Sequence, residues 1–128
     1  MRLVIERLKS RDDFLRVASG RHKYATPGLV LQMRQREDIS AAGPTAGPAR
    51  VGFTATRKLG SAVVRNRARR RLREAARAVL PVAGRPGCDY VLIARSGTLT
   101  RPYLALLADL ETAVAALAPR NAPEHKAS

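Results

Sequence analysis

Apolar and polar positions recur with a helical spacing between residues 61 and 80. At about 100° per residue, five small or aliphatic side chains fall within an arc of about 80°, the width of the stripe that a globular protein buries. They are Val64, Ala68, Leu72, Ala75 and Val79. Ser61 can accept a hydrogen bond from a free backbone N–H at the start of this helix, and Pro81 is expected to end it after Leu80. The pattern predicts an amphipathic helix.

Two segments have the pattern of strands and are expected to pair antiparallel. Residues 29–34 begin as an apolar run and end in alternation, whereas residues 50–56 alternate throughout. The intervening residues 40–49 are uncharged and rich in Ala, Gly and Pro, which predicts a flexible hairpin loop. One face of the second strand carries a charge and two hydroxyls, those of Arg50, Thr54 and Thr56.

A short helix is predicted before these two strands, and a buried strand is predicted after the amphipathic helix. Ser10 and Asp13 resemble a capping box, so a helix is expected from there to Gly20. Residues 1–9 are basic and weakly patterned, and are expected to cross the surface. Residues 88–94 are almost continuously apolar, which is typical of a central strand covered on both faces.

The last predicted helix begins near Thr100, has Pro102 in its first turn and ends before Pro119. Its expected buried stripe is Tyr103, Leu107, Leu110, Val114 and Leu117. Residues 119–128 are polar and aperiodic, and are expected to form a disordered tail. The chain is therefore predicted to be a single α+β domain over residues 1–118, with the order helix, two or three strands, helix, strand, helix.

Positive charge is concentrated on and just before the central helix. Residues 57–80 contain nine Lys and Arg residues against one Glu, a net +8 of the chain's +14. A solvated helix face normally mixes acidic and basic residues, whereas stacked like charges repel one another. A polyanionic partner accounts for such a face, and Arg in place of Lys favours bidentate contacts with phosphate. Arg71 lies beside the apolar stripe and is expected to extend along the surface. The residues further from the stripe are Arg65, Asn66, Arg67, Arg69, Arg70, Arg73 and Arg77.

Other classes of function find little support in the composition. No run approaches the ~20 apolar residues of a membrane-spanning helix, and residues 1–3 open no signal-peptide pattern, so we expect a cytoplasmic protein with no membrane partner. Cys88 is the only cysteine, which excludes an internal disulfide and a Cys-based zinc site. No Ser-His-Asp or two-carboxylate arrangement indicates catalysis by the chain itself.

The segment GFTATRKLGSAVVRNRARRRLREAAR, residues 52–77, resembles the signature of the bacterial ribonuclease P protein component. That family carries an RNR helix after a strand that ends in a basic pair and Gly. The matching positions lie in uninterrupted register: Gly52, Arg57, Lys58, Gly60, Ala62, Val63, Arg65, Asn66, Arg67, Arg70, Arg73 and Glu74. The resemblance implies the family's fold, a small two-layer α+β sandwich of order αβββαβα. Its four-stranded mixed sheet contains an unusual left-handed βαβ crossover.

The resemblance also implies a function. Members of the family are subunits of an RNA-based endoribonuclease that removes 5′ leaders from precursor tRNA, and the RNA subunit is the catalyst. The expected partners are the RNase P RNA and precursor tRNA, with no obligate protein partner. The Mg²⁺ of the holoenzyme is expected to be held mainly by RNA. The residues expected to bind the RNA subunit are Arg57, Lys58, Arg65, Asn66, Arg67, Arg69, Arg70 and Arg73.

From the same resemblance, single-stranded leader RNA is expected in a cleft between the first helix and the sheet. Phe14 stands where the family commonly places an aromatic ring, although a lone Phe on a short helix is as readily a core residue. Ala18 and Leu31 stand where other members carry rings, so leader contacts are expected to shift toward the polar strand face. The expected leader-binding residues are Phe14, Leu31, Arg50, Thr54 and Thr56.

Two other functions are compatible with the charge. A structural RNA-binding protein, such as a ribosomal component, would share the charge and size but lack a leader cleft. A reader of duplex DNA needs varied polar side chains at base edges, and this helix offers mostly Arg. Cleavage of a precursor by RNase P RNA at low Mg²⁺ separates these hypotheses.

Overall fold

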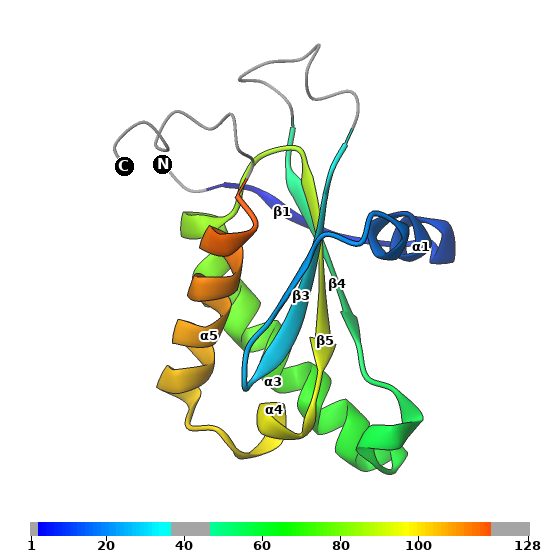
Figure 1. Cartoon of the computed structure of the whole chain (residues 1–128), viewed down its shortest axis with the longest axis vertical. Coiled ribbons are helices and arrows are strands. Elements are labelled where there is room, and N and C mark those ends of the chain that lie inside the picture. Colours follow the sequence, from blue (N-terminus) through cyan, green and yellow to red (C-terminus); the bar gives the residue numbers. More distant parts are fainter. Residues whose placement is uncertain (1–2, 37–46, 119–128) are drawn as a thin grey trace.

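The computed structural model describes residues 3–36 and 47–118. In these residues one mixed sheet has helices on both of its faces (Figure 1). The strands are β1 (Ile5–Arg7), β2 (Lys23–Ala25), β3 (Leu29–Gln35), β4 (Ala49–Thr54) and β5 (Cys88–Ala94). The helices are α1 (Arg11–Ser19), the 3₁₀ helix η2 (Arg57–Leu59), α3 (Ala62–Ala83), α4 (Ser96–Thr100) and α5 (Tyr103–Ala116). Most of the predicted loop at residues 40–49 and the predicted tail at residues 119–128 lie outside the described residues.

The sheet has the strand order β1-β4-β5-β3-β2. β3 runs antiparallel to β2 and β5, whereas β4 runs parallel to β1 and β5. The chain passes from β4 to its parallel neighbour β5 through α3, and the handedness of this crossover stays a prediction. α3 and α5 cover one face of the sheet, and α1 lies against the other (Figure 1). The predicted α+β fold is confirmed.

The sheet described has five strands rather than the expected four, because residues 5–7 form β1 instead of crossing the surface. Three residues are too few to show the alternation that identifies a strand in a sequence. Backbone hydrogen bonds hold the chain at both ends of β1: Leu3 N–H donates to Pro81 O at 2.8 Å, and Leu8 N–H donates to Val51 O at 2.9 Å. Pairing with β4 thus makes β1 the edge of the sheet next to the end of α3.

α3 is the predicted central helix, and it begins as expected. The Ser61 side chain accepts a hydrogen bond from a first-turn backbone N–H at 3.3 Å. The helix ends at Ala83 rather than at Leu80, because Pro81 removes only its own N–H and the final turn survives. Gly84 N–H still donates to Leu80 O at 2.8 Å. The buried residues of the helix are Ala68, Leu72, Ala75, Ala76, Val79 and Leu80.

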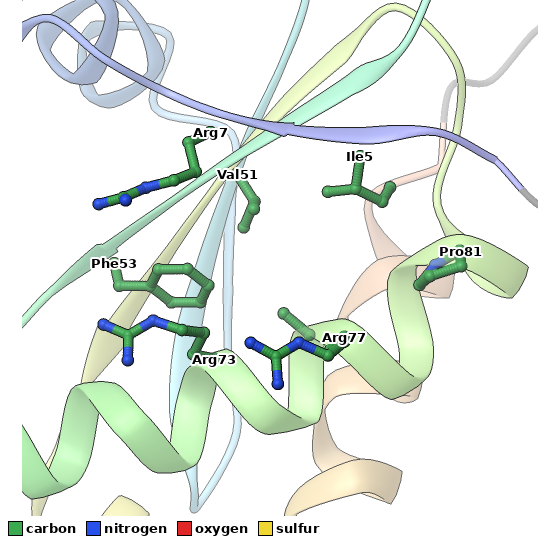
Figure 2. Close-up of a pocket in the computed structure, with 8 residues that line it drawn as sticks. Ile5, Arg7, Val51, Phe53, Arg73, Arg77 and Pro81 are labelled. Carbon is green, nitrogen blue, oxygen red and sulfur yellow. The ribbon is translucent and has the colours of Figure 1, made fainter.

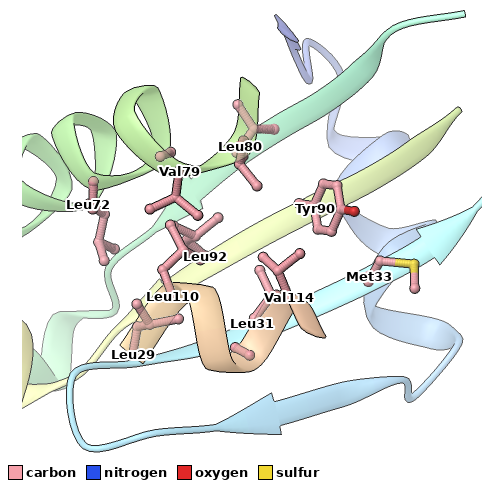
Figure 3. Packing of buried hydrophobic residues seen from close by; sticks show 14 of the residues in the cluster. Leu29, Leu31, Met33, Leu72, Val79, Leu80, Tyr90, Leu92, Leu110 and Val114 are labelled. Atoms are coloured by element: carbon pink, nitrogen blue, oxygen red, sulfur yellow. The ribbon is translucent and has the colours of Figure 1, made fainter. Parts of the chain in front are cut away.

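The hydrophobic core lies between the sheet and the layer formed by α3 and α5 (Figure 3). Its labelled members in that view are Leu29, Leu31, Met33, Leu72, Val79, Leu80, Tyr90, Leu92, Leu110 and Val114. β5 is buried along almost its whole length, as predicted for a central strand. Each fully buried aliphatic side chain contributes about 1.5–3 kcal/mol, so this mostly aliphatic layer makes a large favourable contribution to holding the sheet and helices together.

The predicted last helix is α5, which begins at Tyr103 rather than near Thr100, and a separate short helix, α4, precedes it. Pro102 lies just before α5 rather than inside its first turn, and Tyr103 is 40% exposed rather than part of the stripe. The buried residues of the stripe are Leu106, Leu110, Ala113, Val114 and Leu117. Arg71 extends from α3 to brace the break between the two helices. Its guanidinium donates to the backbone carbonyls of Thr98 (3.0 Å), Leu99 (3.1 Å) and Arg101 (2.7 Å).

Candidate nucleic-acid interface

The polar side of α3 forms an arginine face, which we define as Arg65, Asn66, Arg67, Arg69, Arg70 and Arg73. All six residues are exposed or half-buried. Arg65 donates to Gly60 O at 2.9 Å, and Arg69 donates to Asn66 Oδ1 at 2.7 Å. Within the described part of the chain, none of these arginines forms an ion pair with a carboxylate. The face therefore carries positive charge that no acidic side chain neutralises there.

The basic pair Arg57 and Lys58 lies in η2, immediately before α3, and both residues are exposed. Gly60 joins the two helices with a φ of 151°, a conformation that a side chain would strain. The turn sets the basic pair close to the first turn of α3, where unpaired N–H groups attract anions. The predicted RNA-subunit residues thus lie along one helix and the turn that precedes it.

A buried carboxylate holds three arginines on the side of the sheet that α1 covers. Asp89 of β5 lies in one row with Arg50 of β4 and Arg34 of β3. Arg50 donates to both carboxylate oxygens, from Nε at 2.8 Å and from Nη2 at 2.7 Å. Arg36 donates to the same carboxylate at 2.7 Å, and the Arg34 guanidinium lies 3.9 Å from it. We call these four residues the Asp89 cluster.

The electrostatics of the cluster favour the ionised carboxylate. Burial by itself raises the pKa of Asp89 and is the largest single effect, but hydrogen bonds from Arg50 and Arg36, together with their charges, outweigh it and hold the pKa below its usual value. The hydrogen bond to Asp89 in turn raises the pKa of Arg50. Arg50 also lies 3.6 Å from Asp13 of α1. Glu6 of β1 is in register with Arg50 and also raises its pKa, so the three arginines of the cluster face three carboxylates where the sheet meets α1.

Phe14 lies where α1 meets the sheet, at the place predicted for it. Its half-buried ring packs with Leu8, Val17 and Val91. Gly52 of β4 lies against the ring, and a Cβ at that position would overlap it. The absence of a side chain at Gly52 therefore lets α1 approach the sheet closely. A stacking role for Phe14 stays a prediction.

The other predicted leader residues divide between the two faces of the sheet. Arg50 and Thr54 share the face of β4 that α1 covers, as the alternation predicted, and Thr56 is exposed just before η2. Leu31 is fully buried in the core on the opposite face. Its burial contradicts the expectation that it contacts leader RNA, because the odd-numbered positions of β3 point toward α3 and α5.

Sequence reasoning missed the Asp89 cluster. Arg34 and Arg36 follow the apolar part of β3, and the alternation of that strand could have assigned Arg34 to the face opposite Leu31. The stronger signal was Asp89 itself, a single carboxylate inside an almost wholly apolar strand. A charge in such a position requires partners of opposite sign, which here come from neighbouring strands and the end of β3.

Among residues 3–36 and 47–118, no group of three His, Cys, Asp or Glu side chains lies close enough together to hold a metal ion. In the same residues, no helix is both long and apolar enough to cross a membrane. Cys88 is buried at the start of β5, and burial raises the pKa of its thiol to about 11. The thiol is therefore protonated at neutral pH.

Comparison with known proteins points to a single family. The Ribonuclease P family model matches residues 5–118. The ribonuclease P protein component of Paramagnetospirillum magneticum is 52% identical over 110 residues, which cover 86% of this chain and 80% of that protein. The counterpart from Caulobacter vibrioides is 53% identical over 116 residues, which cover 91% of this chain and 73% of that protein. The RNase P protein of Staphylococcus aureus has a TM-score of 0.67 at 25% identity, covering 86% of this chain and 93% of that one. The RNase P protein of Thermotoga maritima has a TM-score of 0.66 at 26% identity, covering 84% of this chain and 93% of that one.

Proposed function

The chain belongs to the Ribonuclease P family, and on that premise we propose that it binds the RNA subunit of ribonuclease P through the arginine face of α3. The family makes it the RNA-binding protein component of a tRNA-processing ribonucleoprotein. The observation that carries the proposal is the charge of that face, whose arginines have no carboxylate partner in the described residues. Guanidinium groups so placed are free to contact phosphate oxygens bidentately.

The chain contributes binding rather than hydrolysis in this proposal, and the RNA subunit performs the cleavage. Arginines that neutralise RNA phosphates release bound counterions, so the complex gains stability without any reacting group on the protein. A Mg²⁺ site needs oxygen ligands, but the buried Asp89 carboxylate is already held by arginines. In this proposal the Mg²⁺ of the holoenzyme is held mainly by RNA, and the protein acts in the cytoplasm.

The 5′ leader of precursor tRNA, in this proposal, lies on the side of the sheet that α1 covers. Phe14 offers a half-buried ring there, and the Arg50 side chain is 26% exposed beside it. Thr54, at the end of β4, and Thr56, just before η2, add hydroxyl groups further along the chain. Two surfaces on opposite faces of the sheet would allow the protein to contact the RNA subunit and the leader at the same time.

Cleavage of precursor tRNA by a bacterial RNase P RNA at low Mg²⁺ tests the proposal. Added wild-type protein should restore cleavage, and the double variant Arg65→Ala, Arg67→Ala should fail to do so at the same concentration. The double variant Arg21→Ala, Lys23→Ala removes two exposed cations in and just before β2, at the opposite edge of the sheet from β1 and β4, and should act like the wild type. No stimulation by the wild-type protein would favour a structural RNA-binding role instead.

A further inference from the structure

A pocket of about 390 Å³ lies between β1, β4 and α3, on the side of the sheet away from α1 (Figure 2). Its apolar lining consists of Ile5, Val51, Phe53, Ala76 and Pro81. Arg7 of β1 and two arginines of α3, Arg73 and Arg77, complete the lining. Figure 2 shows Arg7 and Arg73 on opposite sides of the Phe53 ring.

The spacing of the sequence explains why these side chains converge. Ile5 and Arg7 share one face of β1, so Glu6 between them points to the other face. Arg73 and Arg77 are four residues apart on α3 and therefore lie one above the other on the same side of the helix. Each arginine thus reaches the pocket from an element that also supplies its apolar wall.

The pocket has an unbalanced charge. None of its lining residues is acidic, and within the described residues none of its three arginines forms an ion pair. Arg73 and Arg77 repel one another at this separation. The Arg73 guanidinium instead lies 5.8 Å from the centre of the Phe53 ring, within the range of a cation–π contact. An aromatic ring and arginines that have no ion-pair partner among the described residues therefore lie side by side.

We propose that this pocket holds one unpaired nucleotide of the RNA subunit, with its base against Phe53 and its phosphate between Arg7 and Arg77. An aromatic ring provides a stacking surface for any base, and guanidinium groups bind phosphate oxygens. The pocket volume falls within the range of small-molecule sites. This inference rests on the proposed function, since it names a further contact with the same RNA.

The position of the pocket favours the RNA subunit over precursor tRNA as the source of the nucleotide. Arg73 belongs to the arginine face, and Arg77 continues that side of α3 toward its C-terminal end. RNA that lies along the arginine face therefore reaches the pocket without crossing the sheet. The proposed leader surface, by contrast, lies on the opposite face, beneath α1.

Binding of the full-length chain to RNase P RNA tests the inference. Phe53→Leu keeps an apolar side chain but removes the ring, and should weaken binding about 5- to 150-fold, the range expected for a lost base–ring contact. Arg7→Gln removes one rim charge and should make the log–log salt slope shallower by about 0.7–0.9. Arg21→Gln changes an exposed arginine away from the pocket and should leave affinity and slope unchanged.

Photocrosslinking locates the contact. RNase P RNA that carries 4-thiouridine at unpaired positions should crosslink to the tryptic peptide of residues 51–57, with the modified residue at Phe53. Precursor tRNA labelled in the same way and added without the RNA subunit should give no crosslink at Phe53. A crosslink from precursor tRNA alone would overturn the assignment to the RNA subunit.

The outcomes distinguish this inference from the proposed function. The pocket would be rejected if Phe53→Leu and Arg7→Gln bound the RNA as tightly as the wild type and no crosslink appeared at Phe53. The proposed function would still stand if the wild-type protein restored cleavage. Wild-type protein that neither binds the RNA nor restores cleavage would reject both. Urea unfolding of each variant detects misfolding. If Phe53→Leu is unstable, the RNA affinity and salt slope of Arg7→Gln decide whether the pocket binds RNA, because Arg7 is exposed.

Discussion

Arg50 and Asp89 form a two-point ion pair across neighbouring parallel strands, in which Nε and Nη2 of the arginine donate to the two carboxylate oxygens at 2.8 and 2.7 Å. The aspartate side chain is 1% exposed, whereas the arginine side chain is 26% exposed. A buried acid in the middle of the sheet is thereby connected to a cation at the surface beside α1. The pair orients that cation and stabilises the sheet through one contact.

Asp89→Asn should lower the free energy of unfolding by about 2–3 kcal/mol, because the amide leaves three guanidinium groups without their shared counter-ion. Partial exposure of the arginines keeps the loss below that of a fully buried pair. Urea unfolding at neutral pH measures the change. Glu111→Gln, on the exposed side of α5, is the control and should stay within about 0.5 kcal/mol of the wild type. Equal stability of Asp89→Asn would show that the cluster has no net stabilising role.

The lowered pKa of Asp89 makes part of the stability depend on pH. Its folded pKa lies below the unfolded value of about 3.9, so its contribution is complete above about pH 4 and is lost as the pH falls through the folded value. Wild-type stability should therefore fall more steeply than that of Asp89→Asn between about pH 4 and pH 2. Unfolding in urea across this range provides the comparison. Parallel curves would assign the acid sensitivity to other carboxylates.

Binding to the RNA subunit should depend strongly on salt. Six to eight arginines that each neutralise a phosphate give a log–log slope of roughly −4 to −7. Arg67→Ala should weaken binding and make the slope shallower without affecting stability, since Arg67 is exposed on the arginine face. Arg65→Ala should also cost about 0.5–1.5 kcal/mol of stability, because it loses the hydrogen bond to Gly60 O. A wild-type slope shallower than about −2 would contradict the proposed interface.

Phe14→Leu separates packing from stacking at the contact between α1 and the sheet. Leucine keeps most of the apolar area, so the free energy of unfolding should fall by only about 1 kcal/mol. Loss of the ring should nevertheless weaken binding of a precursor with a long leader by about 5- to 150-fold. Leu15→Ala, on the exposed side of the same helix, is the matched control. If a longer leader strengthens precursor binding as much in Phe14→Leu as in the wild type, that result would show that Phe14 is a packing residue only.

Gly52→Ala should destabilise the protein by about 1–3 kcal/mol, because its new methyl group meets the Phe14 ring. The same substitution should cost less in a Phe14→Ala background, where the ring is gone. A double-mutant cycle measured by urea unfolding gives the coupling between the two positions. Additive effects would show that Gly52 is required for another reason.

The sequence predicted α3 and its arginine face well because both depend on local features. A helix of 22 residues repeats its period several times, and Ser61 marks its start unambiguously. The alternation of β4 was equally informative, and it correctly assigned Arg50 and Thr54 to one face. Long, regular elements are therefore the part of this fold that residue spacing determines.

Features that depend on contacts between distant segments were not predicted. β1 is a strand only because β4 pairs with it, and the break before α5 is held by Arg71, which reaches across from α3. The inward orientation of Leu31 follows from its pairing with β5, since a strand that begins as an apolar run does not show which face is buried. The pocket with Arg7 likewise requires the pairing of β1 with β4.

The single acid in β5 also constrains how the sheet can assemble. A strand that is apolar on both faces can slide by one residue and still bury aliphatic side chains on each side, so hydrophobicity alone specifies its alignment weakly. A slip of one position would move Asp89 into the aliphatic layer beneath α3 and α5, away from Arg34, Arg36 and Arg50. The cost of an unpaired buried charge makes that alternative alignment uncompetitive. Asp89 therefore specifies the register of β5, because it favours one strand alignment among several that the apolar residues would tolerate.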